Sequence, residues 1–284
     1  MSKWSVTDIM QALNLISEGD IEFEATGISI DSRTIKPGEI FVAVQGDSFN
    51  GHDFLQAALD KGATAFIISR SPPDFLKNHT YFIVPDTLEA LRQLAAYNRN
   101  RSKAKVIAIT GSAGKTTTKE WLAQTLAPFG ATVYSPASYN NHFGAPLSLT
   151  SLEEDTDFGV FELGMNHEGE IEPLARLVQP DVAIITTIAD SHIGYLKSVS
   201  KIAAEKSTIF AGLKQGGTAI LNYDSDYFDF LSEVATKHGT GKIVKVGKKP
   251  GADVRLVHCD YNPTTDTTTI EAEVNQKHIQ YTLS

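Results

Sequence analysis

The chain has 284 residues, which suggests two domains at about 150 residues per domain. Its 34 acidic and 25 basic side chains give a net charge of −9, which argues against a nonspecific nucleic-acid coat, because such proteins present a strongly basic face. Hydrophobic residues make up 42% and charged residues 21%, a composition that can bury a core and that excludes disorder as the main state.

The cysteine content and the hydropathy pattern exclude two further classes. Cys259 is the only cysteine, so neither an intrachain disulfide nor a multi-cysteine zinc site can form. Residues 1–14 lack the apolar core of a signal peptide, and no stretch approaches the roughly 20 apolar residues of a membrane helix. We therefore expect a soluble cytoplasmic protein.

The first part of the chain contains short apolar runs separated by helical patterns. Strands are predicted at 40–44, 65–68 and 81–84. Apolar residues recur at helical spacing over 54–59, and Gly62 is expected to end that helix. Thr87 is expected to cap a second helix, which bridges to the next part of the chain.

The second part starts with residues 106–109, a run that is apolar on both faces, as central strands of parallel sheets are. Further strands are predicted at 158–163, 182–188, 218–221 and 243–246. Helical patterns separate them, at 115–126, 171–177, 202–213 and 228–238. This alternation of strands and helices indicates right-handed crossovers and a mostly parallel sheet.

The last part of the chain has a different pattern. Residues 254–258, 267–274 and 277–283 alternate apolar and polar side chains, and Asn275 and Gln276 lie between the last two runs. This pattern predicts antiparallel edge strands joined by a hairpin.

The predicted fold class is therefore α/β, with a small N-terminal α/β domain followed by a mostly parallel central sheet flanked by helices. Antiparallel strands at its edge complete that sheet. We place the domain limits at 1–85 and 104–284, with a connecting helix or linker at 86–103.

The strongest motif is a glycine-containing loop between a buried strand and a helix. It comprises Thr110, Gly111, Ser112, Ala113, Gly114, Lys115, Thr116 and Thr117. The two glycines let backbone N–H groups turn toward an anion, and the following helix adds the positive end of its dipole. Lys115 can reach the β- and γ-phosphates of a nucleotide, and Thr116 offers a hydroxyl to Mg²⁺. Ile109 stands where the general phosphate-loop pattern has its first glycine, so the loop is a shortened variant of a P-loop. A chance Gly-Ser turn is the weaker alternative to an ATP site.

Several motifs around this loop resemble the Mur ligases, the ATP-dependent amide-bond-forming enzymes of peptidoglycan precursor synthesis. These motifs cover nearly the whole chain: Asp31-Ser32-Arg33, residues 37–43, Gly51-His52-Asp53-Phe54, the loop at 110–118, residues 139–146, Glu162-Leu163-Gly164-Met165-Asn166-His167, Gly169-Glu170-Ile171, His192 and Lys206. Within the family, the Glu-Leu-Gly-x-Asn stretch favours the ligases that join D-Ala-D-Ala to UDP-MurNAc-tripeptide.

The resemblance implies a reaction in two steps, with ATP and two Mg²⁺ ions as cofactors. The γ-phosphoryl group of ATP is transferred to a substrate carboxylate, and an amine then attacks the resulting acyl phosphate. Such a transfer depends on positioning and on neutralising charge rather than on a protein nucleophile. The partners implied are UDP-MurNAc-tripeptide and D-Ala-D-Ala, bound by a monomer without nucleic acid or membrane insertion.

The resemblance also implies a catalytic and metal-binding set, formed by Lys115, Thr116, Glu162, His192 and Lys206. Glu162 would hold Mg²⁺, which prefers oxygen ligands, and His192 would bind a second magnesium. Lys206 would carry a CO₂-derived carbamate, which requires a neutral amine and hence a lowered pKa. By residue type alone, a strand-end glutamate, a loop histidine and a helix lysine are more often ordinary solvated groups; Lys201 is the alternative to Lys206.

Two further residue sets follow from the same resemblance. Asn140 and Asn141 would contact phosphate or metal-bound water, and Asn222 and Asp224 would contact adenine and ribose. The UDP-sugar would be held by Ser32, Arg33, Asn50 and His52. Without the resemblance, the asparagine pair indicates a turn and Arg33 an exposed loop residue.

Mur ligases have three domains, and the resemblance accounts for the first two of them. We therefore expect residues 1–284 alone to bind substrates weakly and to ligate poorly or not at all, because domain closure completes the site and excludes water. Two alternatives to this ligase stay open: another Mur ligase such as MurE, and a non-catalytic module that binds ATP and a UDP-sugar. A folate-type polyglutamate ligase is a third, but the motifs at 31–54 argue against it, because a nucleotide-sugar domain would have no purpose there.

Overall fold

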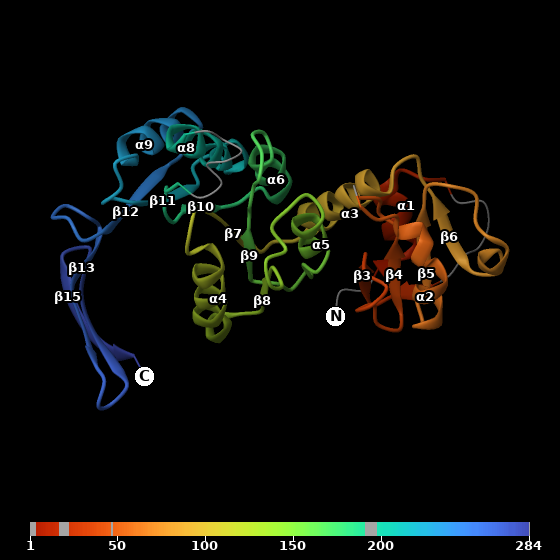
Figure 1. The fold of residues 1–284 in the computed structure, drawn as a ribbon, viewed down its shortest axis with the longest axis horizontal. Coiled ribbons are helices and arrows are strands. Elements are labelled where there is room, and N and C mark those ends of the chain that lie inside the picture. Colours follow the sequence, from red (N-terminus) through yellow and green to blue (C-terminus); the bar gives the residue numbers. More distant parts are fainter. Residues whose placement is uncertain (1–3, 17–22, 47, 191–197, 284) are drawn as a thin grey trace. The chain divides into compact units, whose positions relative to one another are not determined.

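The computed structural model describes residues 4–16, 23–46, 48–190 and 198–283 (Figure 1). By its internal contacts the chain divides into two compact units, the first formed by 1–105 and 123–161 and the second by 106–122 and 162–284. This division is not the linear one expected from the sequence, so the domain limits at 85 and 104 stay a prediction. None of the helices in the described ranges is both long and apolar enough to cross a membrane.

The first unit contains a four-stranded parallel sheet in the order β3-β4-β5-β6. Its strands and helices have these bounds: β1 Trp4–Ser5, α1 Val6–Leu13, β2 Glu24–Ala25, β3 Gly27–Ser29, β4 Glu39–Val42, η1 Gly51–Phe54, α2 Leu55–Asp60, β5 Ala65–Ile68, η2 Asp74–Leu76, β6 Thr80–Ile83, α3 Thr87–Arg101, η3 Ala127–Phe129, β8 Thr132–Tyr134, α5 Gly144–Leu149 and β9 Phe158–Glu162. The last residue of β9, Glu162, already belongs to the second unit. β8 and β9 pair in parallel.

Alternation along β4 explains how this small sheet is covered on both faces. Ile40 and Val42 belong to a buried cluster with residues of α1 and α3, whereas Phe41 belongs to another cluster with Leu55 and Ala58 of α2. Successive side chains of a strand point to opposite faces, so one short apolar run serves two cores. The continuous apolar runs predicted as buried strands are therefore confirmed.

The helix that follows β6 begins one residue earlier than the sequence suggested. Asp86, not Thr87, is its cap, because the Asp86 carboxylate accepts hydrogen bonds from the N–H groups of Leu88 and Glu89 at 2.8 and 3.0 Å. The Thr87 hydroxyl donates instead to the carbonyl oxygen of Ala43, at 2.9 Å. Both residue types are good caps, and the tertiary contact with Ala43 decides which one is used.

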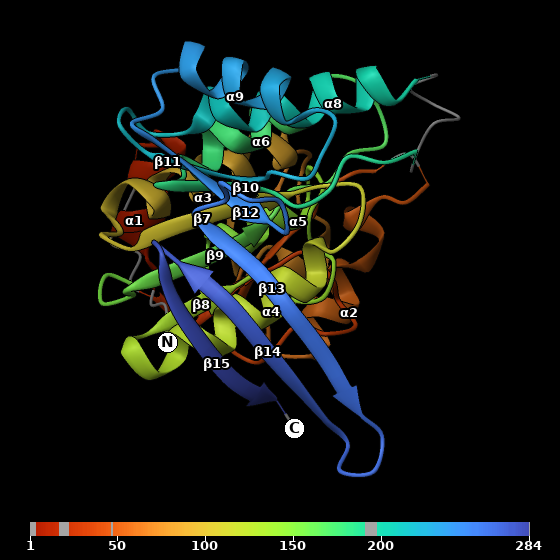
Figure 2. The ribbon, with the colours of Figure 1, turned by 90° about the vertical axis from the view of Figure 1, so that its left-hand side faces the viewer.

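In the second unit the strands follow one another in the order β15-β14-β13-β12-β11-β10-β7. Its elements are β7 Lys105–Thr110, α4 Lys115–Leu126, α6 Ile171–Val178, β10 Val182–Ile185, α8 Val199–Ser207, η4 Thr208–Gly212, β11 Thr218–Asn222, α9 Phe228–Lys237, β12 Lys242–Gly247, β13 Val254–Asn262, β14 Thr267–Val274 and β15 Lys277–Leu283. The strands from β7 to β13 pair in parallel, and β13, β14 and β15 pair antiparallel. The α8 and α9 helices cover one face of the parallel strands and α4 the other (Figures 1 and 2). The predicted fold class is confirmed.

Three predicted elements differ from the observed ones by more than a residue or two. The strand expected at 182–188 ends at Ile185, and the helix expected at 202–213 is two pieces, α8 and η4. The β13 strand continues to Asn262 beyond a register shift between Leu256 and His258, which interrupts the alternation visible in the sequence. The hairpin at Asn275 and Gln276 is confirmed, and both residues have positive φ, as tight hairpin turns require.

Candidate functional site

The phosphate loop leaves β7 at Thr110 and enters α4 at Lys115, as the sequence predicted. Gly111 has a φ of 153° and Gly114 a φ of 82°, both in the region that favours glycine. A Cβ atom at Gly111 would lie 1.9 Å from Oγ1 of Thr186, so a side chain cannot be placed there without moving the loop. Glycine at position 111 is therefore required by both backbone conformation and space.

The loop is fastened to the segment that follows β10. The Thr186 hydroxyl donates to the Ala113 carbonyl oxygen at 2.6 Å, and the Ser112 N–H donates to the Thr187 carbonyl oxygen at 2.7 Å. The Ser112 hydroxyl donates to the carbonyl oxygen of Ala189 and accepts from its N–H, both at 3.0 Å. Ser112, predicted as an ATP contact, thus uses its own polar groups to hold the loop in shape.

Two side-chain hydrogen bonds lie at the point where the loop enters α4, and they involve Lys115, Thr116 and Glu162. The Lys115 ammonium donates to the Gly111 carbonyl oxygen at 2.9 Å, so the side chain folds back over the loop. The Thr116 hydroxyl donates to Oε2 of Glu162 at 2.9 Å. Glu162 is the last residue of β9 and is 1% exposed, which a carboxylate tolerates only when polar groups surround it. Thr116 and Glu162, both predicted as magnesium ligands, are therefore brought together.

Lys206 is buried in α8 and lies in the electrostatic range of Lys115. It is 1% exposed, whereas the alternative Lys201 has a half-exposed side chain that pairs with Glu168. The pKa of Lys206 is lowered from 10.5 to about 8, first by burial and then by the charge on Lys115, while the charge on Glu205 opposes the shift. A lysine in this environment holds more neutral amine near physiological pH than an exposed one.

The residues predicted to contact adenine and ribose are largely engaged with the chain itself. Oδ1 of Asn222 accepts from the N–H of Asp224 at 2.9 Å. The Asp224 carboxylate accepts from the N–H groups of Lys248 and Lys249 at 2.7 and 3.0 Å, and these bonds lower its pKa. Asp224 therefore organises the loop after β12.

Asn140 and Asn141 belong to the first unit. Oδ1 of Asn141 accepts from the N–H groups of Phe143 and Gly144 at 3.2 and 2.9 Å, where α5 begins. The Asn140 N–H donates to the Ser138 carbonyl oxygen at 2.8 Å. The turn expected of this pair from residue type alone is present, and its contact with a nucleotide stays a prediction.

The first unit contains a cavity of about 600 Å³ whose wall is rich in aromatic rings. It is lined by Ile30, Asp31, Ser32, Arg33, Phe41, Phe49, Gly51, Phe54, Ser138, Tyr139, Asn141, Phe143 and Gly144. The rings of Phe49 and Phe143 lie 6.0 Å apart between centroids. Apolar walls with a few polar groups are typical of a site for a small organic ligand.

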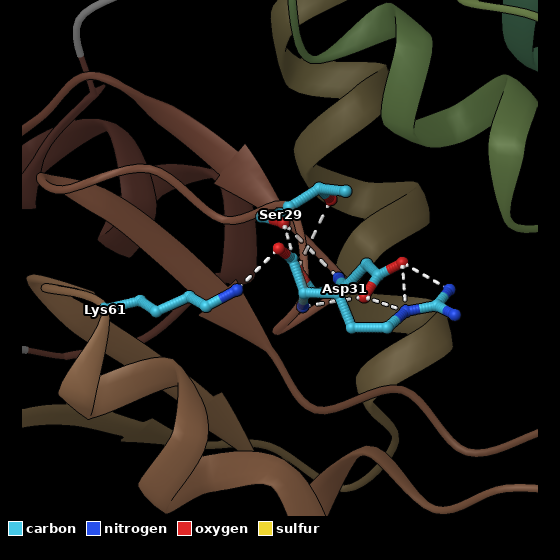
Figure 3. Close-up of polar contacts among 5 residues, drawn as sticks. Ser29, Asp31 and Lys61 are labelled. Carbon is cyan, nitrogen blue, oxygen red and sulfur yellow. Dashed lines mark hydrogen bonds and ion pairs between the residues drawn. The ribbon is translucent and has the colours of Figure 1, made fainter.

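Ser32 and Arg33 line this cavity, as a UDP-sugar site would require, but Arg33 is already paired with Asp31. Figure 3 shows the polar contacts around Asp31. The Arg33 guanidinium donates to both oxygens of Asp31, with the shortest contact at 2.7 Å, and the Lys61 ammonium donates to the Arg33 carbonyl oxygen at 2.5 Å. Hydrogen bonding to Arg33 is the largest cause of the lowered pKa of Asp31. The Arg33 side chain nevertheless stays 87% exposed.

Asn50 and His52 are not among the residues that line the cavity. The His52 ring is buried and has a hydrogen-bond partner at each nitrogen. Its Nδ1 lies 2.9 Å from Oδ1 of Asn50, and its Nε2 accepts from the Ser69 N–H at 3.0 Å. Because Nε2 accepts, the proton of neutral His52 lies on Nδ1. Burial, followed by the charge on Arg70, lowers the pKa of His52. These two residues support the wall on which Gly51 lies.

One predicted site residue lies outside the described ranges, and several residues at the site were not predicted. His192 lies outside the described residues, and the described ranges contain no cluster of three His, Cys, Asp or Glu side chains. Thr186, Glu205 and the aromatic cavity wall were missed by sequence reasoning. Thr186 could have been found, because it is a polar residue directly after a buried strand, and the neighbouring strand β7 likewise ends in a threonine, Thr110.

Comparisons with known proteins identify the family of this chain. The family model for the Mur ligase middle domain matches residues 109–284, and that for the Mur ligase family catalytic domain matches residues 24–99. The chain belongs to the Mur ligase family. The resemblance noted in the sequence is thereby confirmed.

Individual relatives agree with this result. The UDP-N-acetylmuramoyl-tripeptide–D-alanyl-D-alanine ligase of Rickettsia prowazekii is 34% identical over 90% of this chain and 56% of its own length; that of Escherichia coli is 37% identical over 82% and 50%. A crystal structure of MurF from Acinetobacter baumannii superposes with a TM-score of 0.85 at 32% identity, over 99% of this chain and 60% of that one. MurF from Thermotoga maritima, in complex with ADP, gives 0.77 at 28% identity, over 91% and 58%. The chain thus spans about half the length of the curated relatives that it matches.

Proposed function

We propose that this chain is the nucleotide-binding and UDP-sugar-binding part of an ATP-dependent ligase that joins D-Ala-D-Ala to UDP-MurNAc-tripeptide through an acyl phosphate. The observation that carries the proposal is the phosphate loop with Thr116 hydrogen-bonded to Glu162, in a chain of the Mur ligase family. The names of its relatives supply the substrates.

The loop fits a nucleoside triphosphate on three grounds. Gly111 keeps a side chain out of the loop, α4 directs its N-terminus at the end of the loop, and Lys115 supplies a cation. In addition, the Thr110 hydroxyl is fully buried and finds no hydrogen-bond partner within the described ranges. A buried hydroxyl without a partner is unfavourable unless a ligand or water completes it. The relative from Thermotoga maritima was crystallised with ADP, which agrees with this fit.

The same residues fit magnesium. The Thr116 hydroxyl and the Glu162 carboxylate are hard oxygen donors, the type that Mg²⁺ prefers. When bound, Mg²⁺ would neutralise the charge of the β- and γ-phosphates. We include His192 and a carbamate on Lys206 as ligands of a second Mg²⁺, and the lowered pKa of Lys206 suits the neutral amine that carbamate formation needs.

In this proposal the residues of the chain bind and orient rather than react. Lys115 leaves the Gly111 carbonyl oxygen and pairs with the β- and γ-phosphates, and loop N–H groups orient the triphosphate. The γ-phosphoryl group passes to the substrate carboxylate as ADP leaves; the amine of D-Ala-D-Ala then forms the amide bond and phosphate departs. Neutralising the charges that meet at this point is the main contribution available to the protein.

The cavity of the first unit is proposed to take the UDP-sugar. Phe49 and Phe143 offer ring faces to a planar base, Ser32 and Arg33 offer donors to phosphate or sugar oxygens, and Asn50 and His52 hold the wall. We assign Asn140, Asn141, Asn222 and Asp224 to nucleotide contacts as well, although Asn141 and Asp224 use their side chains within the chain in this structure.

Ligand-induced stabilisation tests the proposal. UDP-MurNAc-tripeptide and Mg²⁺-ATP should each raise the melting temperature in a concentration-dependent way, because both bind the folded state. Lys115→Met should abolish the response to Mg²⁺-ATP and leave the response to the UDP-sugar. A response to Mg²⁺-ATP alone would favour a non-catalytic nucleotide-binding module. We further propose that residues 1–284 by themselves turn over slowly, which phosphate release in the presence of all three substrates would measure.

A further inference from the structure

The Glu205 carboxylate is buried in α8 and accepts two hydrogen bonds from the chain at the start of α6. It is 6% exposed, and its two oxygens accept hydrogen bonds from the N–H groups of Gly169 and Ile171 at 2.8 and 3.0 Å. Ile171 is the first residue of α6, whose own cap residue, Glu170, makes no side-chain cap bond. Glu205 therefore acts as the N-cap of α6 from a neighbouring helix. Charge-assisted bonds of this kind are about twice as strong as neutral ones.

The segment capped by Glu205 joins β9, which ends at Glu162, to α6. It is held at two further points: Oε2 of Glu170 accepts from the N–H groups of Asn166 and His167 at 2.6 and 3.2 Å, and the Lys201 ammonium pairs with Glu168 at 2.6 Å. Lys201 and Glu205 are four residues apart, so they share one face of α8. That face of α8 contacts the segment between β9 and α6 through both residues. The helices α6 and α8 lie side by side (Figures 1 and 2).

Lys206 is the next residue along α8 and is directed to a different side. Adjacent residues of an α-helix are about 100° apart around the axis. The rotation of α8 that places Glu205 on the N-terminus of α6 is thus the rotation that turns Lys206 into the protein, where its side chain is 1% exposed and the charge of Lys115 acts on it. The two contacts are geometrically coupled, because a turn of the helix by a few tens of degrees would undo both.

We propose that Glu205 is a positioning residue that holds Lys206 in its buried orientation, within the electrostatic range of Lys115, by anchoring α8 to the segment between β9 and α6. This proposal rests on the proposed ligase function, because that function places Lys206 in the nucleotide and magnesium site. Glu205 itself contacts neither nucleotide nor substrate in this proposal. The exposed Lys201–Glu168 ion pair adds little to the anchoring of α8, since exposed ion pairs are typically weak.

The matched variants are Glu205→Gln and Glu168→Gln, which make the same chemical change in a buried and an exposed carboxylate of the same cluster. Glutamine keeps the shape of Glu205 but can accept only through one oxygen, and its NH₂ group meets an N–H donor. In Glu205→Gln we expect the amides of Gly169 and Ile171 to exchange hydrogen faster. We also expect the amine of Lys206 to acetylate at least fivefold faster in a brief labelling pulse followed by peptide mass spectrometry.

Two further variants separate positioning from a general loss of stability. Leu231→Ala removes a buried side chain of α9, which contributes neither of the two N–H groups that Glu205 binds, and it destabilises the same unit. When Leu231→Ala and Glu205→Gln have the same free energy of unfolding, Lys206 in Leu231→Ala should still be labelled at the wild-type rate. Lys206 in Glu168→Gln should also be labelled at the wild-type rate. Equal labelling in Glu205→Gln and Leu231→Ala would overturn the proposal. Glu205→Ala, which removes both acceptors, should label faster still.

Nucleotide binding distinguishes this inference from the function on which it rests. Glu205→Gln should weaken binding of a non-hydrolysable Mg²⁺-ATP analogue about tenfold and change Mg²⁺-ADP binding less than twofold, because Lys206 lies near Lys115 at the γ-phosphate end. If the wild-type chain binds neither nucleotide, the proposed function fails, and the labelling result still decides the role of Glu205. If the wild-type chain binds both and Glu205→Gln binds them equally well, the positioning role is refuted.

Discussion

The phosphate loop and the aromatic cavity differ in how their polar side chains are used. At the loop, Thr116 reaches the carboxylate of Glu162, and Lys206 is buried in the range of Lys115. At the cavity, Arg33 is paired with Asp31, and His52 is bonded to Asn50 and Ser69 outside the lining. One region keeps its charged groups close to the place where an anion would bind, whereas the other uses them to build its wall.

This difference follows from what each region must recognise. A triphosphate is bound mainly by backbone N–H groups and point charges. Triphosphate binding by the loop therefore depends on glycine at position 111 and on cations nearby. A cavity of about 600 Å³ lined by rings can bind through shape and apolar contact, so its polar residues are available for support. The predictions below test this division.

The largest effect is expected from Gly111→Ala. The new Cβ atom would lie 1.9 Å from Thr186 Oγ1, so the loop must move, and nucleotide affinity should fall at least 100-fold, about 3 kcal/mol. Gly216→Ala is the control: Gly216 has a φ of 75°, but a Cβ atom there meets nothing within 4 Å. It should cost about 1 kcal/mol in urea unfolding through backbone strain and leave nucleotide binding unchanged. Equal nucleotide affinity in the two variants would show that space at Gly111 is not the controlling factor.

Lys206→Met is expected to stabilise the chain while removing a residue of the proposed site. The lowered pKa of Lys206, about 8 against 10.5, corresponds to at most about 3 kcal/mol by which its charged form disfavours the folded state. That cost is complete below pH 8 and disappears as the pH rises from 8 to 10.5, since the folded state then loses its proton first. In urea unfolding without bicarbonate, the variant should therefore be more stable at pH 7 and equal to wild type near pH 11.

Lys201→Met is the matched control for this experiment. Lys201 lies on the same helix, but its side chain is 54% exposed and pairs with Glu168 at the surface. Its loss should change the free energy of unfolding by less than about 1 kcal/mol at either pH. A gain in stability from Lys201→Met as large as that from Lys206→Met would mean that burial of Lys206 is not the cause.

Sequence patterns were sufficient for the fold and for the parts of the site that depend on the backbone. The strand, glycine and helix order at 105–126 fixed the position of the loop, and apolar runs fixed the central strands. The cap at Asp86 and the pairing of Asp31 with Arg33 could not be predicted, because each depends on which of several nearby donors and acceptors meet in space. Glu205 was missed for the same reason, since its partners Gly169 and Ile171 lie more than thirty residues away in the chain.

A smaller effect is expected from the titration of His52. Its folded-state pKa is lowered from 6.5, so the unfolded chain binds the proton more readily. The stabilising effect of neutral His52 is complete above pH 6.5 and is lost as the pH falls toward the folded-state value, because a protonated Nε2 cannot accept from the Ser69 N–H. The loss should be about 1 kcal/mol, the size of one hydrogen bond. His52→Gln should remove this part of the pH dependence in urea unfolding; an unchanged slope between pH 5 and 7 would contradict the assignment.

The smallest effect is expected from Asp31→Asn, which bears most directly on the cavity. The asparagine oxygen can still accept from the Arg33 N–H, while the guanidinium loses its anionic partner. Because Arg33 is 87% exposed, solvent screens the pair, and stability should hardly change. The affinity for a UDP-sugar should rise about threefold at low salt, since one negative charge leaves a site for a diphosphate, and the gain should vanish at high salt. A fall in affinity would instead show that Asp31 orients Arg33 for the ligand, and the cavity would then depend on placed charge as the phosphate loop does.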